Sequence, residues 1–153
     1  MDGHKAFTIC GDPLYFAPEI VTQRGYDYGA DLWALGILYF ELFEGFNPVG
    51  THDTEETAIF KKLASFDVES LEFSKKTHKK AKSLVVALLE PEVSKRLGYN
   101  GSDEVRGKKI FNDVDWKKIG RDKTIQFELV GHVDAIEEGM FEIVDKVSAF
   151  DEW

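Results

Sequence analysis

The chain has 153 residues, of which 43% are apolar and 13% aromatic, so it is long and hydrophobic enough to bury a core and is not typical of a disordered protein. Its formal net charge of −9 disfavours nucleic acids and anionic membrane surfaces as partners, because both attract basic proteins. Cys10 is the single cysteine, which excludes an intramolecular disulfide and indicates a reducing, cytoplasmic compartment.

Glycines and prolines break the first twenty residues into a looped segment, and a short helix is expected over residues 19–22. A long helix is expected over residues 28–44, because Asp27 is a favourable N-cap and Gly45 lies where the helix would end. Its central stretch, Leu32–Phe43, is almost wholly apolar but only 12 residues long. It is too short to cross a bilayer core of about 30 Å, so we expect no membrane insertion and a helix buried by protein.

Two amphipathic helices should follow. The first is expected over residues 54–65, where Asp53 and Glu56 have the spacing of a capping box. The second is expected over residues 76–89, where apolar side chains recur at helical intervals, and a last short helix over residues 102–109. The expected fold class is therefore mainly α.

The end of the chain is strongly acidic. Residues 134–153 contain seven acids and one lysine, a net charge of −6, which leaves −3 for the preceding 133 residues. This segment is expected to be an extended acidic tail that is either solvated or bound to a basic partner.

The stretch Thr8–Val21, TICGDPLYFAPEIV, resembles the end of a protein kinase activation segment, T-x-C-G-x-P-x-Y-x-A-P-E. The same family is resembled by DLWALG from Asp31, by KRLG at Lys95–Gly98 and by the pair Asp115-Trp116. Together, these motifs are similar to the C-terminal lobe of an AGC-group serine/threonine kinase, most like the cyclic-nucleotide-dependent kinases.

The resemblance implies a partial kinase domain over residues 1–116, the helical kinase-like C-lobe, and an acidic AGC-type C-terminal tail over residues 117–153. It also implies that the opening stretch holds the P+1 region, which receives the substrate residue after the phosphorylated one. Its members here are Gly11, Asp12, Pro13 and Tyr15.

Thr8 matches the position that is phosphorylated in active AGC kinases. A phosphate needs basic partners to order a loop, and in the family the main partner is an arginine beside the catalytic aspartate. Only His4 and Lys5 lie close to Thr8 in this sequence, so phosphorylation and its absence both stay open.

Five further positions carry implied roles. The family pairs the equivalents of Glu19 and Arg96 as a partly buried ion pair, the alternative being two solvated charges. Asp31 and Trp33 anchor the apolar helix: the family's carboxylate accepts backbone hydrogen bonds from the catalytic loop, and Asp31 is also a favourable first-turn acid. Glu41 is implied to contact a basic side chain of a peptide substrate, the alternative being a helix-surface acid.

Phosphoryl transfer requires a glycine-rich loop, a strand lysine, a catalytic aspartate and magnesium ligands. The sequence contains no G-x-G-x-x-G, V-A-I-K, H-R-D or D-F-G motif. Asp12 stands where the family has a threonine, and a carboxylate there would face the catalytic aspartate, although Asp-Pro is also a favourable turn. We therefore expect no catalytic residue, metal site or cofactor, with ATP and Mg bound only if a missing N-terminal part is supplied.

Two functions follow as expectations. The first is a non-catalytic, pseudokinase-like scaffold, in which other protein subunits cover the apolar helix 28–43 and the acidic tail. The second is the C-terminal part of an active cyclic-nucleotide-dependent kinase whose N-terminal part is on another chain or missing. The first is favoured by an expected exposed apolar surface, because the remaining elements should not bury all of Trp33, Leu35, Ile37, Tyr39 and Phe40.

Overall fold

A computed structural model of the chain describes residues 5–119. The chain divides into two compact units, Met1–Val114 and Asp115–Trp153. The predicted domain boundary at residue 116 stays a prediction, and the predicted acidic tail lies outside the described residues.

The described part of the first unit is built from short and medium helices. It contains one isolated antiparallel bridge, between Ala6 and Tyr26, and no strand within the described range. The mainly α fold class is thus confirmed. The elements are η1 (Pro13–Tyr15), α1 (Pro18–Val21), α2 (Gly29–Glu44), α3 (Glu56–Ala64), η2 (Val68–Ser70), α4 (Lys79–Leu88), η3 (Val93–Lys95), α5 (Ser102–Arg106) and η4 (Lys109–Phe111).

The described part of the second unit holds a single helical turn, α6 (Trp116–Ile119). Asp115 precedes it and its Oδ1 accepts hydrogen bonds from the amides of Lys117 and Lys118, at 3.0 and 3.1 Å. This is the usual role of an aspartate before a helix.

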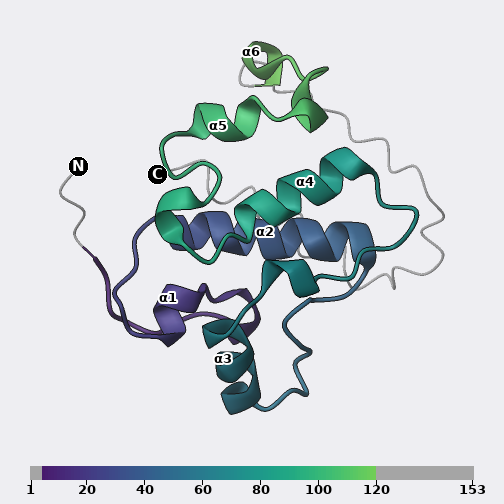
Figure 1. Ribbon diagram of the computed structural model, residues 1–153. Helices are drawn as coiled ribbons and strands as arrows, with labels where there is room; N and C mark the ends of the chain where they lie inside the picture. Colours follow the sequence, from purple (N-terminus) through teal and green to yellow (C-terminus); the bar gives the residue numbers. More distant parts are fainter. Residues whose placement is uncertain (1–4, 120–153) are drawn as a thin grey trace, which may run out of the picture. The chain divides into compact units, whose positions relative to one another are not determined.

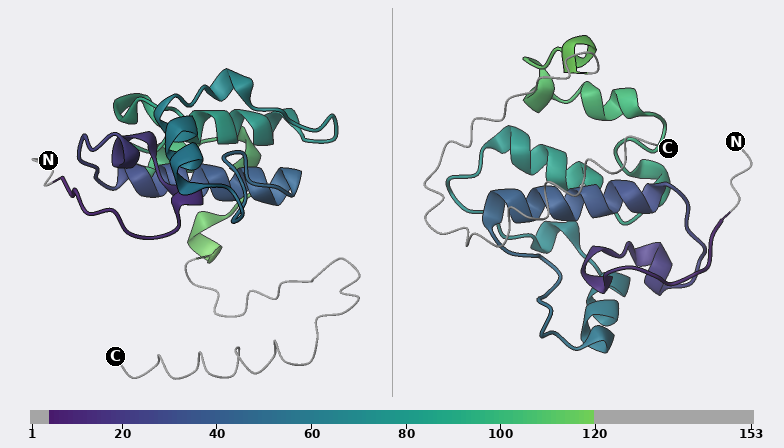
Figure 2. Two further views of the ribbon diagram at one scale, coloured as in Figure 1. Left: turned by 90° about the horizontal axis from the view of Figure 1, so that it is seen from below. Right: turned by 180° about the vertical axis from the view of Figure 1, so that it is seen from behind.

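Helix α2 is the centre of the first unit. Helix α4 lies along one side of it, and α1 and α3 lie together on the other (Figure 1). The view from behind in Figure 2 shows the same order, with α5 beyond α4. The elements on both sides of α2 are therefore positioned by this one helix.

The boundaries of α2 follow from local chemistry. Asp27 Oδ1 accepts a hydrogen bond from the Gly29 amide at 2.8 Å, which satisfies one free donor at the helix start. The helix ends at Gly45, whose φ of 81° is left-handed, and the Gly45 amide donates to the Glu41 carbonyl at 2.8 Å. The predicted helix over residues 28–44 is confirmed to within one residue.

As expected, the remaining elements do not bury all five of the apolar side chains of α2 named from the sequence. Trp33, Ile37 and Phe40 are at most 1% exposed, whereas Leu35 and Tyr39 are only half-buried. The three buried side chains are covered because α3 and the segment after it supply Ile59, Leu63 and Phe66, and α4 and the residue after it supply Val85 and Leu89.

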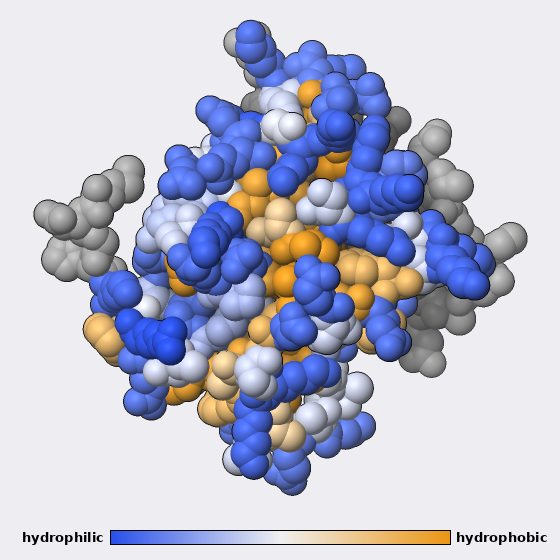
Figure 3. Space-filling model, viewed as in Figure 1, coloured by the Kyte–Doolittle hydropathy of each residue, from blue (hydrophilic) through white to orange (hydrophobic). Residues whose placement is uncertain are grey.

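A different stripe of α2 is exposed. Leu38 and Leu42 are 43% and 68% exposed, and they are followed by the exposed Phe43. Figure 3 shows a band of hydrophobic side chains across the middle of the face seen there. The described surface is thus partly apolar although the core is well filled.

Gly36 allows α2 and α4 to pack closely. A Cβ atom at Gly36 would lie 2.8 Å from Leu89 Cδ2 and 2.9 Å from Leu88 Cβ, closer than real Cβ atoms come. The glycine therefore lets the leucines at the end of α4 pack directly on the α2 backbone.

The expected start of the first amphipathic helix is wrong. Helix α3 begins at Glu56, two residues late, and Glu55 at its N-cap makes no side-chain hydrogen bond. Thr54 Oγ1 instead accepts the Thr51 amide at 2.9 Å, which closes the preceding turn. Asp53, which the capping-box pattern placed at the N-cap, therefore lies two residues before the observed N-cap.

Within residues 5–119, no helix has both the length and the apolar content that crossing a membrane requires.

Candidate functional site

The P+1 region forms a short turn that its own side chains stabilise. Asp12 Oδ1 accepts the Leu14 amide at 3.0 Å, and Pro13 begins η1 with its φ already fixed. Gly11 has a φ of 103°, which favours glycine. Asp12 therefore has the favourable turn role that its position before proline indicates.

Tyr15 links this turn to α2. It lies at the end of η1, and its hydroxyl donates a hydrogen bond to the Glu41 carboxylate. This hydrogen bond, together with partial burial and the nearby charges of Glu41 and Asp12, raises the pKa of Tyr15 to about 12. Glu41 is thus held by a neutral phenol and keeps acceptor capacity for a further donor.

The surroundings of this turn are acidic. Asp12 contributes to the raised pKa of Tyr15, so its charge lies within reach of the Tyr15–Glu41 pair. Its second oxygen lies 3.9 Å from Nδ1 of His52, whose side chain is 83% exposed. Two carboxylates at a partly exposed turn favour a cationic ligand over an anionic one.

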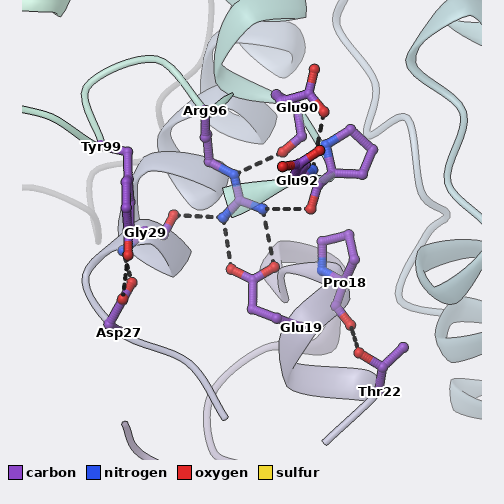
Figure 4. A network of polar contacts seen from close by, with 10 residues as sticks. Pro18, Glu19, Thr22, Asp27, Gly29, Glu90, Glu92, Arg96 and Tyr99 are labelled. Atoms are coloured by element: carbon purple, nitrogen blue, oxygen red, sulfur yellow. Dashed lines mark hydrogen bonds and ion pairs between the residues drawn. The ribbon is translucent and has the colours of Figure 1, made fainter. Parts of the chain in front are cut away.

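A second group of polar contacts holds α1 against the start of α2. Arg96 Nη1 and Nη2 donate to Oε1 and Oε2 of Glu19 at 2.7 and 3.0 Å, a bidentate ion pair with Arg96 0% exposed. Arg96 also donates to the carbonyls of Gly29 at 2.8 Å and Glu90 at 2.9 Å (Figure 4). The ion pair that the family resemblance implies is therefore present and buried, and the two charges are not both solvated.

Trp33 lies beside this ion pair. The Arg96 guanidinium sits 5.2 Å from the centre of the Trp33 ring, and Phe66 packs edge-on against the same ring at 4.9 Å. The Trp33 indole N–H has no hydrogen-bond partner among the described residues. Trp33 thus anchors α2 by packing rather than by hydrogen bonding.

Thr8 and Asp31, unlike the buried Glu19, Arg96 and Trp33, lie at the surface. Both are exposed, and neither side chain makes a hydrogen bond to another residue of the described range. Thr8 is held through its backbone, because its carbonyl accepts the Tyr26 hydroxyl at 2.7 Å. Its hydroxyl is therefore accessible for modification, while Asp31 has the first-turn position expected from the sequence.

A cluster near the start of α2 was not predicted from the sequence. Tyr28 stacks on Tyr99 at 5.2 Å, and the Tyr99 hydroxyl donates to Asp27 Oδ2 at 3.1 Å. That hydrogen bond and the Asp27 charge raise the pKa of Tyr99. No local pattern connects residues 72 positions apart, so only the family alignment of the surrounding motifs would have indicated that they meet.

The possible metal ligands of the described residues do not gather into a cluster. Within residues 5–119 no three His, Cys, Asp or Glu side chains lie closely enough to hold a metal ion. Magnesium in a kinase is held by carboxylate and amide oxygens together with the phosphates. The expectation about ATP and Mg therefore stays a prediction.

Known proteins match this chain over most of its length. The protein kinase domain family matches residues 1–109. A serine/threonine-protein kinase YPK2/YKR2 from Saccharomyces cerevisiae is 39% identical over 118 residues, which are 77% of this chain and 17% of the yeast protein.

Cyclic-nucleotide-dependent kinases match as well. A cAMP-dependent protein kinase catalytic subunit of Dictyostelium discoideum is 34% identical over 125 residues, covering 75% of this chain and 17% of that protein. A cGMP-dependent protein kinase of Drosophila melanogaster is 34% identical over 116 residues, covering 74% of this chain and 12% of its own length. The chain spans less than a quarter of the length of each of these relatives. It belongs to the protein kinase domain family, and these relatives are serine/threonine kinases of the AGC group.

Proposed function

We propose that the described residues are the peptide-recognition part of a serine/threonine kinase domain, with Glu41 as the carboxylate that receives a basic side chain of the peptide substrate. The observation that carries this proposal is the hydrogen bond from Tyr15 to Glu41. It fixes the acid of α2 beside the P+1 turn, where a bound peptide would run.

The local charge supports a basic peptide. Asp12 and Glu41 together place two negative charges around Tyr15, and the phenol that bonds Glu41 stays neutral because its pKa is about 12. An arginine has five donors in a planar fork and retains its charge at all working pH values, so it suits a carboxylate with acceptor capacity left. The domain's activity would be phosphorylation of such a peptide, with ATP and Mg held by residues other than the described ones.

The test is a binding measurement with a matched pair of peptides. A fluorescein-labelled heptapeptide with an Arg-Arg pair before a serine is compared with the same peptide carrying citrulline, the neutral isostere of arginine. We expect fluorescence anisotropy to show binding of the arginine peptide only, and Glu41→Gln to weaken it roughly tenfold, or about 1.4 kcal/mol.

The control variant is Glu56→Gln, which removes an exposed acid from the first turn of α3. It should leave the affinity unchanged. Equal affinity for the two peptides, or an equal loss in the two variants, would refute the assignment of Glu41.

A second function is favoured by a different observation. Leu38, Leu42 and Phe43 expose an apolar stripe on α2, and such a stripe binds protein or aggregates. A non-catalytic scaffold would use it to bind other subunits. The two functions differ in ATP and Mg dependence: a rise in the melting temperature of the full chain with ATP and Mg, reversed by EDTA, would exclude the non-catalytic scaffold.

A further inference from the structure

A basic hollow lies on a different surface of the first unit, between the start of α4 and the turn that joins α5 to η4. It has a volume of about 470 Å³ and opens to solvent. Figures 1 and 2 show α5 alongside α4, which brings the two lining segments together. The lining residues are Lys79, Lys80, Ser83, Gly107, Lys108 and Lys109.

The charge of this hollow is unlike that of the chain as a whole. Residues 73–89 contain five lysines and no acid, in a protein of net charge −9. None of the four lining lysines forms an ion pair with a residue in the range 5–119. Their ammonium groups are therefore available to a ligand.

Two neighbouring charged groups, Lys82 and Glu104, have partners outside the hollow. Lys82 is occupied elsewhere, because its ammonium group donates to the Ser74 carbonyl at 3.1 Å and lies 5.3 Å from the Phe73 ring centre. The carboxylate of Glu104 is bound by the Gly98 amide, which chiefly lowers the pKa of Glu104, while Lys108 contributes more weakly.

The first turn of α4 adds an independent argument. It begins with Lys79 and Lys80 and has no acidic residue. The N-terminus of a helix is positive, so lysines there are unfavourable unless an anion is bound. His78 Nδ1 already accepts the Lys80 amide at 3.1 Å, so a ligand would be held by side-chain charge rather than by a ring of backbone amides.

We propose that this hollow binds an acidic segment of a partner protein. Lysines are point charges on flexible stems, so four of them can accommodate a run of carboxylates whose positions are not fixed. The net charge of the chain disfavours nucleic acids and anionic membranes, whose fields extend over the whole protein. This surface is separate from the Tyr15–Glu41 turn and has the opposite charge, so the inference does not depend on the proposed peptide-recognition function.

The test uses the full chain and a fluorescein-labelled dodecapeptide of alternating glutamate and glycine, with anisotropy read at low and high salt. The double variants Lys79→Gln/Lys80→Gln and Lys108→Gln/Lys109→Gln should each weaken binding roughly fivefold, which is about 1 kcal/mol. The matched control is Lys61→Gln/Lys62→Gln in α3, which changes net charge equally and should leave the affinity within twofold, or roughly 0.4 kcal/mol.

Thermal unfolding without peptide gives a second readout. Removing Lys79 and Lys80 from the positive end of α4 should raise the melting temperature, whereas Lys61 and Lys62 lie in the last turn of α3, where cations are favourable, so removing them should not. The proposal is overturned if the control pair weakens peptide binding as much as the hollow variants, or if neither hollow variant weakens it. It is also overturned if single-stranded DNA or phosphatidylserine vesicles bind more tightly and lose binding in the same variants.

Discussion

Replacing Glu19 with glutamine should strongly destabilise the first unit, because Glu19 is the one carboxylate within residues 5–119 that is bonded to Arg96. Both Arg96 Nη atoms donate to Glu19, at 2.7 and 3.0 Å, and neither residue is more than 6% exposed. Glutamine keeps the shape and one acceptor oxygen. Its amide nitrogen, however, would face a guanidinium nitrogen, donor against donor.

The magnitude follows from what Arg96 can and cannot do after the change. A guanidinium does not deprotonate, so the buried charge stays and has only neutral acceptors, which are the amide oxygen of the new glutamine and the carbonyls of Gly29, Glu90 and Pro91. Removing one partner of a buried ion pair costs about 3–5 kcal/mol. Domains of this size have about 5–15 kcal/mol of stability, so the loss is a large part of the total.

Urea unfolding followed by circular dichroism measures this loss. With an m value of about 1.5 kcal/mol per M, the unfolding midpoint should fall by about 2–3 M. The control is Asp103→Asn, which breaks the exposed 3.4 Å ion pair with Arg106 and should leave the midpoint unchanged. A shift of less than about 0.5 M in Glu19→Gln would refute the reasoning, because it would mean that the charge of Arg96 needs no counter-ion.

Three further changes test other parts of the fold. The pKa of Tyr15 is raised from 10.0 to about 12, so its hydrogen bond to Glu41 stabilises the fold fully below pH 10 and is lost as the pH rises through 12. Glu41→Gln should lower the pKa of Tyr15 in an NMR titration, and an unchanged pKa would contradict the assignment. Gly36→Ala should lower the melting temperature, because overpacking against Leu89 costs about 1–3 kcal/mol, whereas alanine's helix propensity returns about 1 kcal/mol. Gly45→Ala should cost about 1–2 kcal/mol of stability through its left-handed φ alone, since no atom lies within 4 Å of the added Cβ. Gly45→Asn should lose less stability, because asparagine tolerates that φ better. Equal losses of the two variants in urea unfolding would argue against backbone strain.

Hydrophobic pattern and end signals predicted the long helices well. The apolar run and Gly45 gave α2 to within one residue, and the apolar periodicity gave α4, although α4 begins at Lys79, three residues after the predicted start. The pattern did not predict which face of α2 is exposed. An almost wholly apolar helix has no polar face to mark the solvent side, so the choice between Leu35 and Leu38 depends on where α3 and α4 pack.

The contacts of the site could be predicted from local sequence patterns less well than the helices. Glu19 and Arg96 are 77 residues apart, so their pairing was inferred from the family motif rather than from any periodicity. The hydrogen bond between Tyr15 and Glu41 joins residues 26 apart and was not predicted, although both were named as candidates. The backbone carbonyls that accept hydrogen bonds from Arg96 could not be predicted, because every residue carries a carbonyl and the sequence does not distinguish them.

Helix α2 contacts both polar groups, the Glu19–Arg96 ion pair and the Tyr15–Glu41 pair, at different points along its length. The Gly29 carbonyl, in its first turn, accepts from Arg96, and Glu41 lies 12 residues further on, about 18 Å along the axis. The buried ion pair holds the start of α2 against α1, whereas the acid near its end faces the P+1 turn.

Stability and peptide affinity should therefore respond to different substitutions. Glu19→Gln should lower the urea midpoint while the folded protein keeps the affinity of the unaltered chain for the arginine peptide, and Glu41→Gln should weaken the peptide with a much smaller change in midpoint. If both variants lost stability and affinity in proportion, the Tyr15–Glu41 contact would be part of the fold's support rather than a site.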